Sequence, residues 1–186
     1  MRAVELPANK NSVVMDERAV RRAIARMARE IVERNAGTED LILIGIHRRG
    51  VDLADLLAEE IEKGEGRDIP RGSLDITLYR DDFSAIGPRP IIGSTDIPGN
   101  IDDRSVVIVD DVCHTGRTTR AALDELADFG RPGRIYLCVL IDRGGRELPI
   151  QPDFVGRHIE VGPHEDVAVL VPREDGELAV QLRDVE

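Results

Sequence analysis

The most informative stretch of the sequence places two carboxylates, a short loop and the start of a helix directly after a run of apolar residues. Residues 106–109 are apolar, Asp110 and Asp111 follow them, and residues 115–118 are Thr-Gly-Arg-Thr. Backbone N–H groups at a helix N-terminus, threonine hydroxyls and a glycine that permits close approach form a cradle for a phosphate dianion. The carboxylates would repel that phosphate, so they suit hydrogen bonds from vicinal hydroxyls instead. A ribose 5-phosphate meets both requirements.

A scaffold must bring these groups together, and the pattern of apolar residues indicates which one. The runs 41–46, 105–109 and 135–141 are largely apolar, as in strands that are buried on both faces of a parallel sheet. Segment 74–79 alternates like a further strand, and apolar residues at helical spacing predict a helix over 15–35 and other helices after the strands. This alternation predicts an α/β fold, a mostly parallel twisted sheet flanked by helices, with ligands at the carboxyl ends of its strands.

Composition limits the class of protein. The 186 residues are 41% hydrophobic and 33% charged, which favours one compact domain over residues 1–186. The net charge of −11 argues against broad electrostatic adhesion to nucleic acid or membranes. No apolar run is long enough to span a bilayer, so we expect a cytoplasmic protein without a membrane partner. Cys113 and Cys138 lack the spacing of metal ligands and are expected to be buried thiols.

The predicted first helix carries an arginine stripe. The stripe consists of Arg18, Arg22, Arg26 and Arg29, which fall on one face at helical spacing. Two interpretations remain open. The stripe is either a surface for the phosphates of RNA, with an affinity that falls steeply with salt, or an ordinary solvated helix face that is partly neutralised by Glu17 and Glu30.

The segment 106–118 resembles the phosphoribosyl pyrophosphate (PRPP) motif of the type I phosphoribosyltransferases. The resemblance implies the type I phosphoribosyltransferase fold, with Asp110 and Asp111 on the ribose 2′ and 3′ hydroxyls and residues 115–118 on the 5-phosphate. It also implies that residues 48–50 form the loop that binds pyrophosphate. The implied catalytic residues are Asp110, Asp111, Arg80 and Arg49. The implied nucleotide-binding residues are Arg48, Arg49, Gly50, Asp110, Asp111, Val112, Cys113, His114, Thr115, Gly116, Arg117 and Thr118.

The same resemblance implies a lid, a hood and a metal ion. The flexible lid is expected over about residues 80–104, and the small hood over about residues 141–160 together with the C-terminal tail. Closure of the lid would exclude water, which otherwise hydrolyses PRPP. Mg²⁺ is expected to bind mainly through PRPP, without an assigned protein ligand, and to act with Arg48, Arg49 and Arg80 on the departing pyrophosphate.

Further segments narrow the resemblance to the PyrR family, bacterial regulators of pyrimidine operons that are also uracil phosphoribosyltransferases. These segments are residues 16–35, 75–82, 142–149 and 153–156, together with the PRPP motif. The family implies that uracil and PRPP give UMP and pyrophosphate. It also implies that the protein, with UMP or UTP bound, binds the leader mRNA of a pyrimidine operon and promotes transcription termination. We expect a homodimer or a higher homo-oligomer.

The base is expected under the hood, at Ile141, Arg143, Phe154 and Val155. Backbone groups of Val155 are expected to recognise the polar edge of the base. Two interpretations of Phe154 stay open, stacking on the base and ordinary core packing. Two interpretations of His114 also stay open: it relays a proton to the base, or it makes a contact without a role in the reaction.

Two other functions compete with this assignment. One is a phosphoribosyltransferase for another base, hypoxanthine or guanine, without RNA binding, because those enzymes share the PRPP motif. The other is an RNA-binding regulator with little turnover, which the arginine stripe favours.

Overall fold

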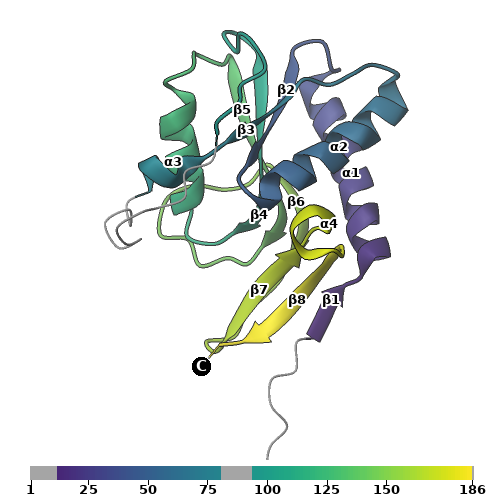
Figure 1. The fold of residues 1–186 in the computed structure, drawn as a ribbon, viewed down its shortest axis with the longest axis vertical. Helices are drawn as coiled ribbons and strands as arrows, with labels where there is room; N and C mark the ends of the chain where they lie inside the picture. The colour runs from purple at the N-terminus through teal and green to yellow at the C-terminus, as the bar shows by residue number, and fades with distance from the viewer. Residues whose placement is uncertain (1–11, 81–93, 186) are drawn as a thin grey trace, which may run out of the picture.

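The computed structural model of the chain describes residues 12–80 and 94–185 (Figure 1). The larger sheet has five strands in the order β3-β2-β4-β5-β6, and every neighbouring pair is parallel. Its strands are β2 (Leu41–Ile46), β3 (Arg71–Leu74), β4 (Ser105–Cys113), β5 (Arg134–Asp142) and β6 (Phe154–His158). The α/β fold with a mostly parallel sheet that the sequence predicts is thereby confirmed.

Helices cover both faces of this sheet, which explains the continuous apolar runs. The helices are α1 (Glu17–Asn35) and α2 (Arg49–Glu65) on one face, and α3 (Arg117–Leu126) on the other (Figure 1). Successive residues of a strand point to opposite faces. In β2, Leu41 and Leu43 accordingly pack with α1 and α2, whereas Ile42 and Ile44 pack with α3. Within residues 12–80 and 94–185, no helix has both the length and the apolar character that crossing a membrane requires.

The C-terminal segment forms a second, antiparallel sheet with the strand that precedes α1. Its strands are β1 (Ser12–Met15), β7 (Glu165–Leu170) and β8 (Ala179–Asp184), in the order β1-β8-β7. The short helix α4 (Pro172–Asp175) connects β7 to β8 and lies beside α2 (Figure 1). Val167, Val169 and Val180 belong to the same hydrophobic cluster as α1 and α2, so the two sheets share one core.

The strand that the sequence predicts over residues 74–79 is only partly present in the structure. We predicted a strand over 74–79, but β3 ends at Leu74 and a 3-10 helix, η1 (Ile76–Tyr79), follows. The cause is Asp75, whose carboxylate accepts hydrogen bonds from the backbone N–H of Thr77 at 3.0 Å and from the hydroxyl of Thr77. Such a side-chain bond to the nearby backbone starts a turn and competes with the strand ladder.

The expected lid, residues 80–104, overlaps the described structure at Arg80 and at residues 94–104. Residues 81–93 lie outside the described residues. The second part is attached to the sheet, because Asp96 exchanges two backbone hydrogen bonds with Ser73 of β3, at 2.8 and 2.9 Å. Ile101 is fully buried against the α3 face. Through Asp96 and Ile101, residues 94–104 are therefore attached to the domain in this structure.

Candidate active site

A cavity of about 290 Å³ lies at the carboxyl ends of β2 and β4. Both strands deliver charged side chains to it, as the parallel sheet predicts. Three arginines and two adjacent aspartates face the same space. The lining residues are Ile46, His47, Arg48, Arg49, Asp75, Ile76, Thr77, Arg80, Asp110, Asp111, Val112 and Thr118.

The loop after β2 brings two arginines to this cavity. Gly50 is buried against the backbone of β4, so no side chain separates the loop from the strand. The guanidinium of Arg49 forms a bidentate ion pair with Asp175, with Nε to Oδ2 at 3.2 Å and Nη2 to Oδ1 at 2.9 Å. Arg48 lies farther from its partner, with 3.7 Å between Nη1 and Oε2 of Glu174. The loop thus presents two guanidinium groups, and ion pairs with Asp175 and Glu174 partly fix their orientation.

The two aspartates after the apolar run of β4 differ in environment. Asp110 is 7% exposed, and its Oδ1 accepts the backbone N–H of Asp111 at 2.9 Å. Burial, and then the charge of Asp111, raise the pKa of Asp110 well above the ordinary carboxyl value. Asp111 is half-buried and accepts the N–H of Val112 at 2.8 Å. A carboxyl with so strongly raised a pKa in a polar cavity marks a candidate functional group.

The predicted phosphate loop, residues 115–118, leads into the N-terminus of α3. Gly116 has φ of 93°, a left-handed conformation that favours glycine, and it precedes the first residue of α3. The hydroxyl of Thr115 accepts the N–H of Arg117 at 3.3 Å, and Arg117 Nε donates to Glu147 at 2.8 Å. Among the described residues of this loop, Thr118 lines the cavity. The N-terminus of α3 therefore borders the same space as Asp110.

The neighbouring residues Cys113 and His114 do not line the cavity. Cys113 is buried, and burial raises the pKa of its thiol to about 11, so the thiol stays protonated near neutral pH. The ring of His114 lies against Gly145, where an added Cβ would come within 2.8 Å of Nε2. This position lies outside the described lining of the cavity, and the proton-relay role of His114 stays a prediction.

Two of the residues expected at the base have core positions. Phe154 is 3% exposed and packs edge-to-face on Tyr136, with 5.7 Å between ring centroids. Ile141 is fully buried in the same cluster. The burial of Phe154 on the α1 side of the sheet favours the core-packing interpretation, and stacking on a base stays a prediction. Arg143 is half-buried and pairs with Asp166 of β7.

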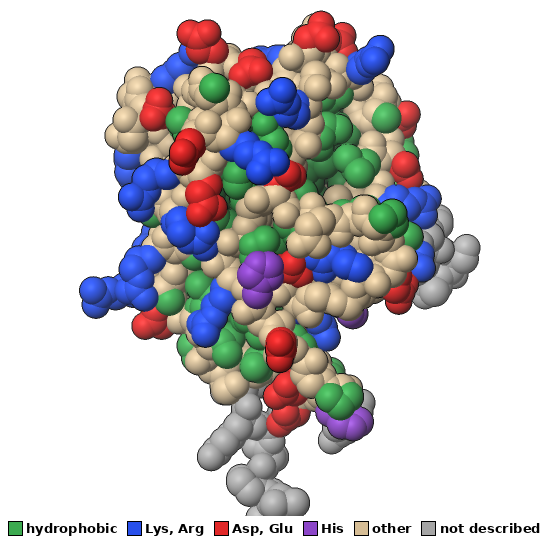
Figure 2. All heavy atoms as spheres, turned by 180° about the vertical axis from the view of Figure 1, so that it is seen from behind, with side chains coloured by type: hydrophobic (Ala, Val, Ile, Leu, Met, Phe, Trp, Pro, Cys, Tyr) green, Lys and Arg blue, Asp and Glu red, His purple; other side chains and the backbone are tan. Residues whose placement is uncertain are grey.

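The structure also separates the members of the arginine stripe. Arg26 is bound within the protein: its Nη2 donates to the carbonyl oxygens of Val155 at 3.0 Å and Gly156 at 2.7 Å, and its Nη1 to Glu30 at 2.9 Å. Arg26 therefore ties α1 to β6, and its role in RNA contact stays a prediction. The side chains of all four members, Arg18, Arg22, Arg26 and Arg29, are nevertheless exposed. In Figure 2, Lys and Arg side chains gather along the left side of the molecule, where α1 lies in that view.

Sequence reasoning missed several residues of the site. His47, Asp75 and Thr77 line the cavity, and all three follow the ends of strands, which is the signal that was available. Asp142, at the end of β5, lies within the predicted hood and outside the cavity lining; it is 5% exposed and forms an ion pair with Arg146 at 2.8 Å. Burial raises its pKa, but a hydrogen bond from the backbone N–H of Gly144 and the guanidinium of Arg146 outweigh burial and hold the pKa below the ordinary value.

Comparisons with known proteins identify the family of the chain. Residues 12–172 match the family described as phosphoribosyl transferase domain. The chain is 50% identical to the bifunctional protein PyrR of Deinococcus radiodurans, with 94% of this chain and 96% of the relative covered. It is 54% identical to the bifunctional protein PyrR of Thermus thermophilus, with 91% of this chain and 93% of the relative covered.

Solved structures with the same fold include two purine enzymes. A hypoxanthine-guanine phosphoribosyltransferase from Bacillus anthracis superposes with a TM-score of 0.71 at 18% identity, covering 94% of this chain and 98% of that one. The hypoxanthine phosphoribosyltransferase of Trypanosoma cruzi gives a TM-score of 0.71 at 19% identity, covering 94% and 97%. At such low identity these structures establish the fold alone.

Proposed function

The chain belongs to the PyrR family within the phosphoribosyl transferase domain family, and from this membership we propose that it is both a uracil phosphoribosyltransferase and an RNA-binding regulator of pyrimidine genes. As an enzyme it joins uracil to the ribose of PRPP and releases pyrophosphate, which yields UMP. The observation that carries this proposal is the cavity at the ends of β2 and β4, where three arginines face two adjacent carboxylates.

The residues of the cavity divide between the two halves of PRPP. Transfer breaks the bond from the anomeric carbon of ribose to pyrophosphate and forms a bond from that carbon to a ring nitrogen of uracil. Positive charge develops on the ribose and negative charge on pyrophosphate, so preorganised charges accelerate the step. Arg48, Arg49 and Arg80 stabilise the pyrophosphate. Asp110 and Asp111 accept hydrogen bonds from the ribose hydroxyls, and their charge lies near the developing cation.

The cavity also fits Mg²⁺. Asp110 and Asp111 offer carboxylate oxygens, the ligands that Mg²⁺ prefers, within the same space as the arginines. When bound, mainly through PRPP, Mg²⁺ neutralises charge on the pyrophosphate. A cation at this place would also favour the ionised form of Asp110, whose burial otherwise opposes ionisation.

The domain and its base-binding part are proposals of the same kind. The proposal of one phosphoribosyltransferase domain over residues 1–186 is supported, within the described part of the chain, by the hydrophobic cluster that β1, β7 and β8 share with α1 and α2. The hood, about residues 141–160, receives the base beside Arg143 and the backbone of Val155. Asp142 and Arg146 fix the start of this hood.

The enzymatic proposal is tested by a panel of bases. Purified protein is incubated with PRPP, Mg²⁺ and radiolabelled uracil, hypoxanthine, guanine or orotate, and the nucleotide products are separated. We expect UMP from uracil and background counts from the other bases. Product from hypoxanthine or guanine alone would assign the enzyme to purine bases instead.

The regulatory proposal rests on the exposed arginines of α1. Arg18, Arg22 and Arg29 form a positive strip on an otherwise acidic chain, and uridine nucleotide in the cavity is proposed to favour RNA binding. A gel-shift titration with the leader transcript of a pyrimidine operon, with and without UMP, tests it. We expect UMP to strengthen binding and salt to weaken it. Absence of binding at low salt in both titrations would leave only the enzyme.

A further inference from the structure

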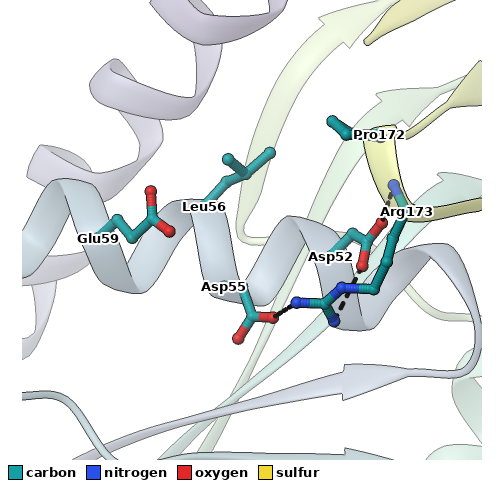
Figure 3. Close-up of a pocket in the computed structure, with 6 residues that line it drawn as sticks. All are labelled: Asp52, Asp55, Leu56, Glu59, Pro172 and Arg173. Carbon is teal, nitrogen blue, oxygen red and sulfur yellow. Dashed lines mark hydrogen bonds and ion pairs between the residues drawn. The ribbon is translucent and has the colours of Figure 1, made fainter. Parts of the chain in front are cut away.

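The short helix α4 is attached to the start of α2 and to the loop before it by several ion pairs. Three consecutive residues take part, and each faces a residue in the first two turns of α2 or the loop before it. Arg173 pairs with Asp52 at 3.2 Å and Asp55 at 2.9 Å, Glu174 pairs with Arg48 at 3.7 Å, and Asp175 pairs with Arg49 at 2.9 Å. Arg173, Asp52 and Asp55 line a cavity of about 300 Å³, and Figure 3 shows the guanidinium of Arg173 directed toward both aspartates.

Asp175 is a fixed acceptor within this turn. Its Oδ2 accepts the backbone N–H of Val171 at 2.9 Å, and its own N–H donates to the carbonyl of Val171 at 2.8 Å. Its two oxygens take the Nε and Nη2 edge of Arg49. The pair raises the pKa of Arg49 and lowers that of Asp175, so both groups are charged over the working pH range.

Arg49 also belongs to the cavity at the ends of β2 and β4. Arg49 lines the cavity together with Asp111, whose charge also acts on the guanidinium. Among the described residues, no other hydrogen bond to this guanidinium is found. Since arginine has five N–H donors and the bidentate pair uses two of them, the Nη1 edge remains for an anion in the cavity.

We propose that Asp175 is a positioning residue that holds Arg49 with its remaining N–H groups toward the pyrophosphate of PRPP, and that Arg173 anchors the turn that carries Asp175. The proposal rests on the proposed function of the cavity and assigns part of it to the C-terminal hairpin. An unpaired arginine would sample many rotamers and lose that freedom on binding. Because Asp175 already restricts the rotamers of Arg49, less conformational entropy is lost when pyrophosphate binds. The leaving-group site is thus preorganised.

The test is Asp175→Asn. Asparagine retains an oxygen for the N–H of Val171, so the turn keeps its internal hydrogen bond, while the charge and the second acceptor for Arg49 are lost. Affinity for pyrophosphate with Mg²⁺ is measured by calorimetry, and KM for PRPP, KM for uracil and kcat by UMP formation. The matched control is Asp124→Asn, which breaks an exposed aspartate-arginine pair with Arg120 on α3, outside the cavity lining.

We expect Asp175→Asn to weaken pyrophosphate binding and to raise KM for PRPP by about tenfold each, with KM for uracil within twofold. The control should match the wild type. Unchanged or tighter pyrophosphate binding in Asp175→Asn would overturn the positioning role, as would a fall in kcat alone. If the wild type binds pyrophosphate but forms no UMP, the proposed function fails, and the affinities still decide the role of Asp175.

A second variant keeps the proposal testable if Asp175→Asn does not fold. Arg173→Gln removes the anchor of the turn and leaves Arg49 and Asp175 in place. We expect pyrophosphate binding about threefold weaker than in the wild type, in the same direction as for Asp175→Asn. Full affinity in this variant would overturn the anchoring role of Arg173.

Discussion

Gly50 lies against the carbonyl oxygen of Val109, and a Cβ added to Gly50 would come within 2.4 Å of that oxygen. This contact sets the distance between the two halves of the site. Arg49 directly precedes the glycine after β2, and Asp110 directly follows the valine in β4. The backbone of the loop therefore lies on the strand because no side chain intervenes.

Gly50→Ala should damage both stability and activity. The added methyl group must displace backbone atoms of either the loop or β4, which costs about 2 kcal/mol in the free energy of unfolding. Because the displacement moves Arg49 away from Asp110, KM for PRPP should rise more than KM for uracil. Urea unfolding and steady-state kinetics measure the two effects.

The matched control is Gly64→Ala in the last turn of the same helix, where nothing lies within 4 Å of an added Cβ. Here alanine should stabilise by up to about 1 kcal/mol, since it favours helix more than glycine does. Equal stability of the two variants would contradict the close approach of loop and strand.

Asp110→Asn should stabilise the protein at neutral pH while it impairs the enzyme. The pKa of Asp110 is raised in the folded state, so the folded protein binds this proton more tightly than the unfolded chain. Stability from this group is therefore greatest at low pH and falls as the pH rises from the ordinary carboxyl range toward the raised pKa. The asparagine variant does not lose stability in this way as the pH rises. Its Tm should exceed that of the wild type by about 3 °C at pH 7.5, and the two Tm values should match near pH 4.

The same substitution should lower kcat/KM for PRPP by about tenfold or more, because a charge near the developing ribose cation is removed. Thermal melts at several pH values and initial rates provide the comparison. A Tm difference that does not change with pH would show that Asp110 is not the group that titrates.

The part of the site that could be predicted from sequence is the part that is local in the chain. Asp110, Asp111 and Thr118 belong to one strand-loop-helix segment, and apolar periodicity identifies the strand that positions them. Arg48 and Arg49 follow the end of β2 in the same way. Since parallel strands end at one edge of the sheet, the meeting of these groups follows from the fold class.

The remainder depends on contacts between distant segments. Arg49 and Asp175 are 126 residues apart, and a charged turn such as residues 172–175 is typical of a solvated surface in sequence. Phe154 is apolar in either environment, so its residue type does not distinguish core from base site. The strand predicted over 74–79 failed because Asp75 bonds to its own neighbours, a local competition that alternation of apolar residues does not reveal.

Phe154→Leu should separate core packing from contact with the base. Phe154 is buried against Tyr136, so leucine leaves a small void and removes the edge-to-face contact. We expect a loss of about 1.5 kcal/mol in the free energy of unfolding and an unchanged KM for uracil at a temperature well below Tm. A selective rise in KM for uracil, with stability intact, would restore the stacking interpretation.

Arg26→Ala should act on the hood rather than on RNA. Arg26 donates to the carbonyl oxygens of Val155 and Gly156, which belong to β6. Without Arg26 the two carbonyl groups bond to water and α1 is held less firmly on this strand. We expect a cost of only about 1 kcal/mol in the free energy of unfolding, since the Arg26 side chain is 46% exposed. Because Val155 belongs to the proposed base site, KM for uracil should rise by about threefold while KM for PRPP stays constant.

Arg22→Ala is the matched control, one helical turn earlier on the same exposed face of α1. The structure gives Arg22 no tie to β6 among the described residues, so stability and KM for uracil should equal the wild-type values. If the exposed arginines contact RNA phosphates, Arg22→Ala should reduce affinity for leader RNA and lower its salt dependence by about one counterion, uniformly across RNA sequences. We thus expect Arg26→Ala to change KM for uracil and Arg22→Ala to change RNA affinity. A larger loss of RNA affinity in Arg26→Ala than in Arg22→Ala, with unchanged uracil kinetics, would show that Arg26 contacts RNA.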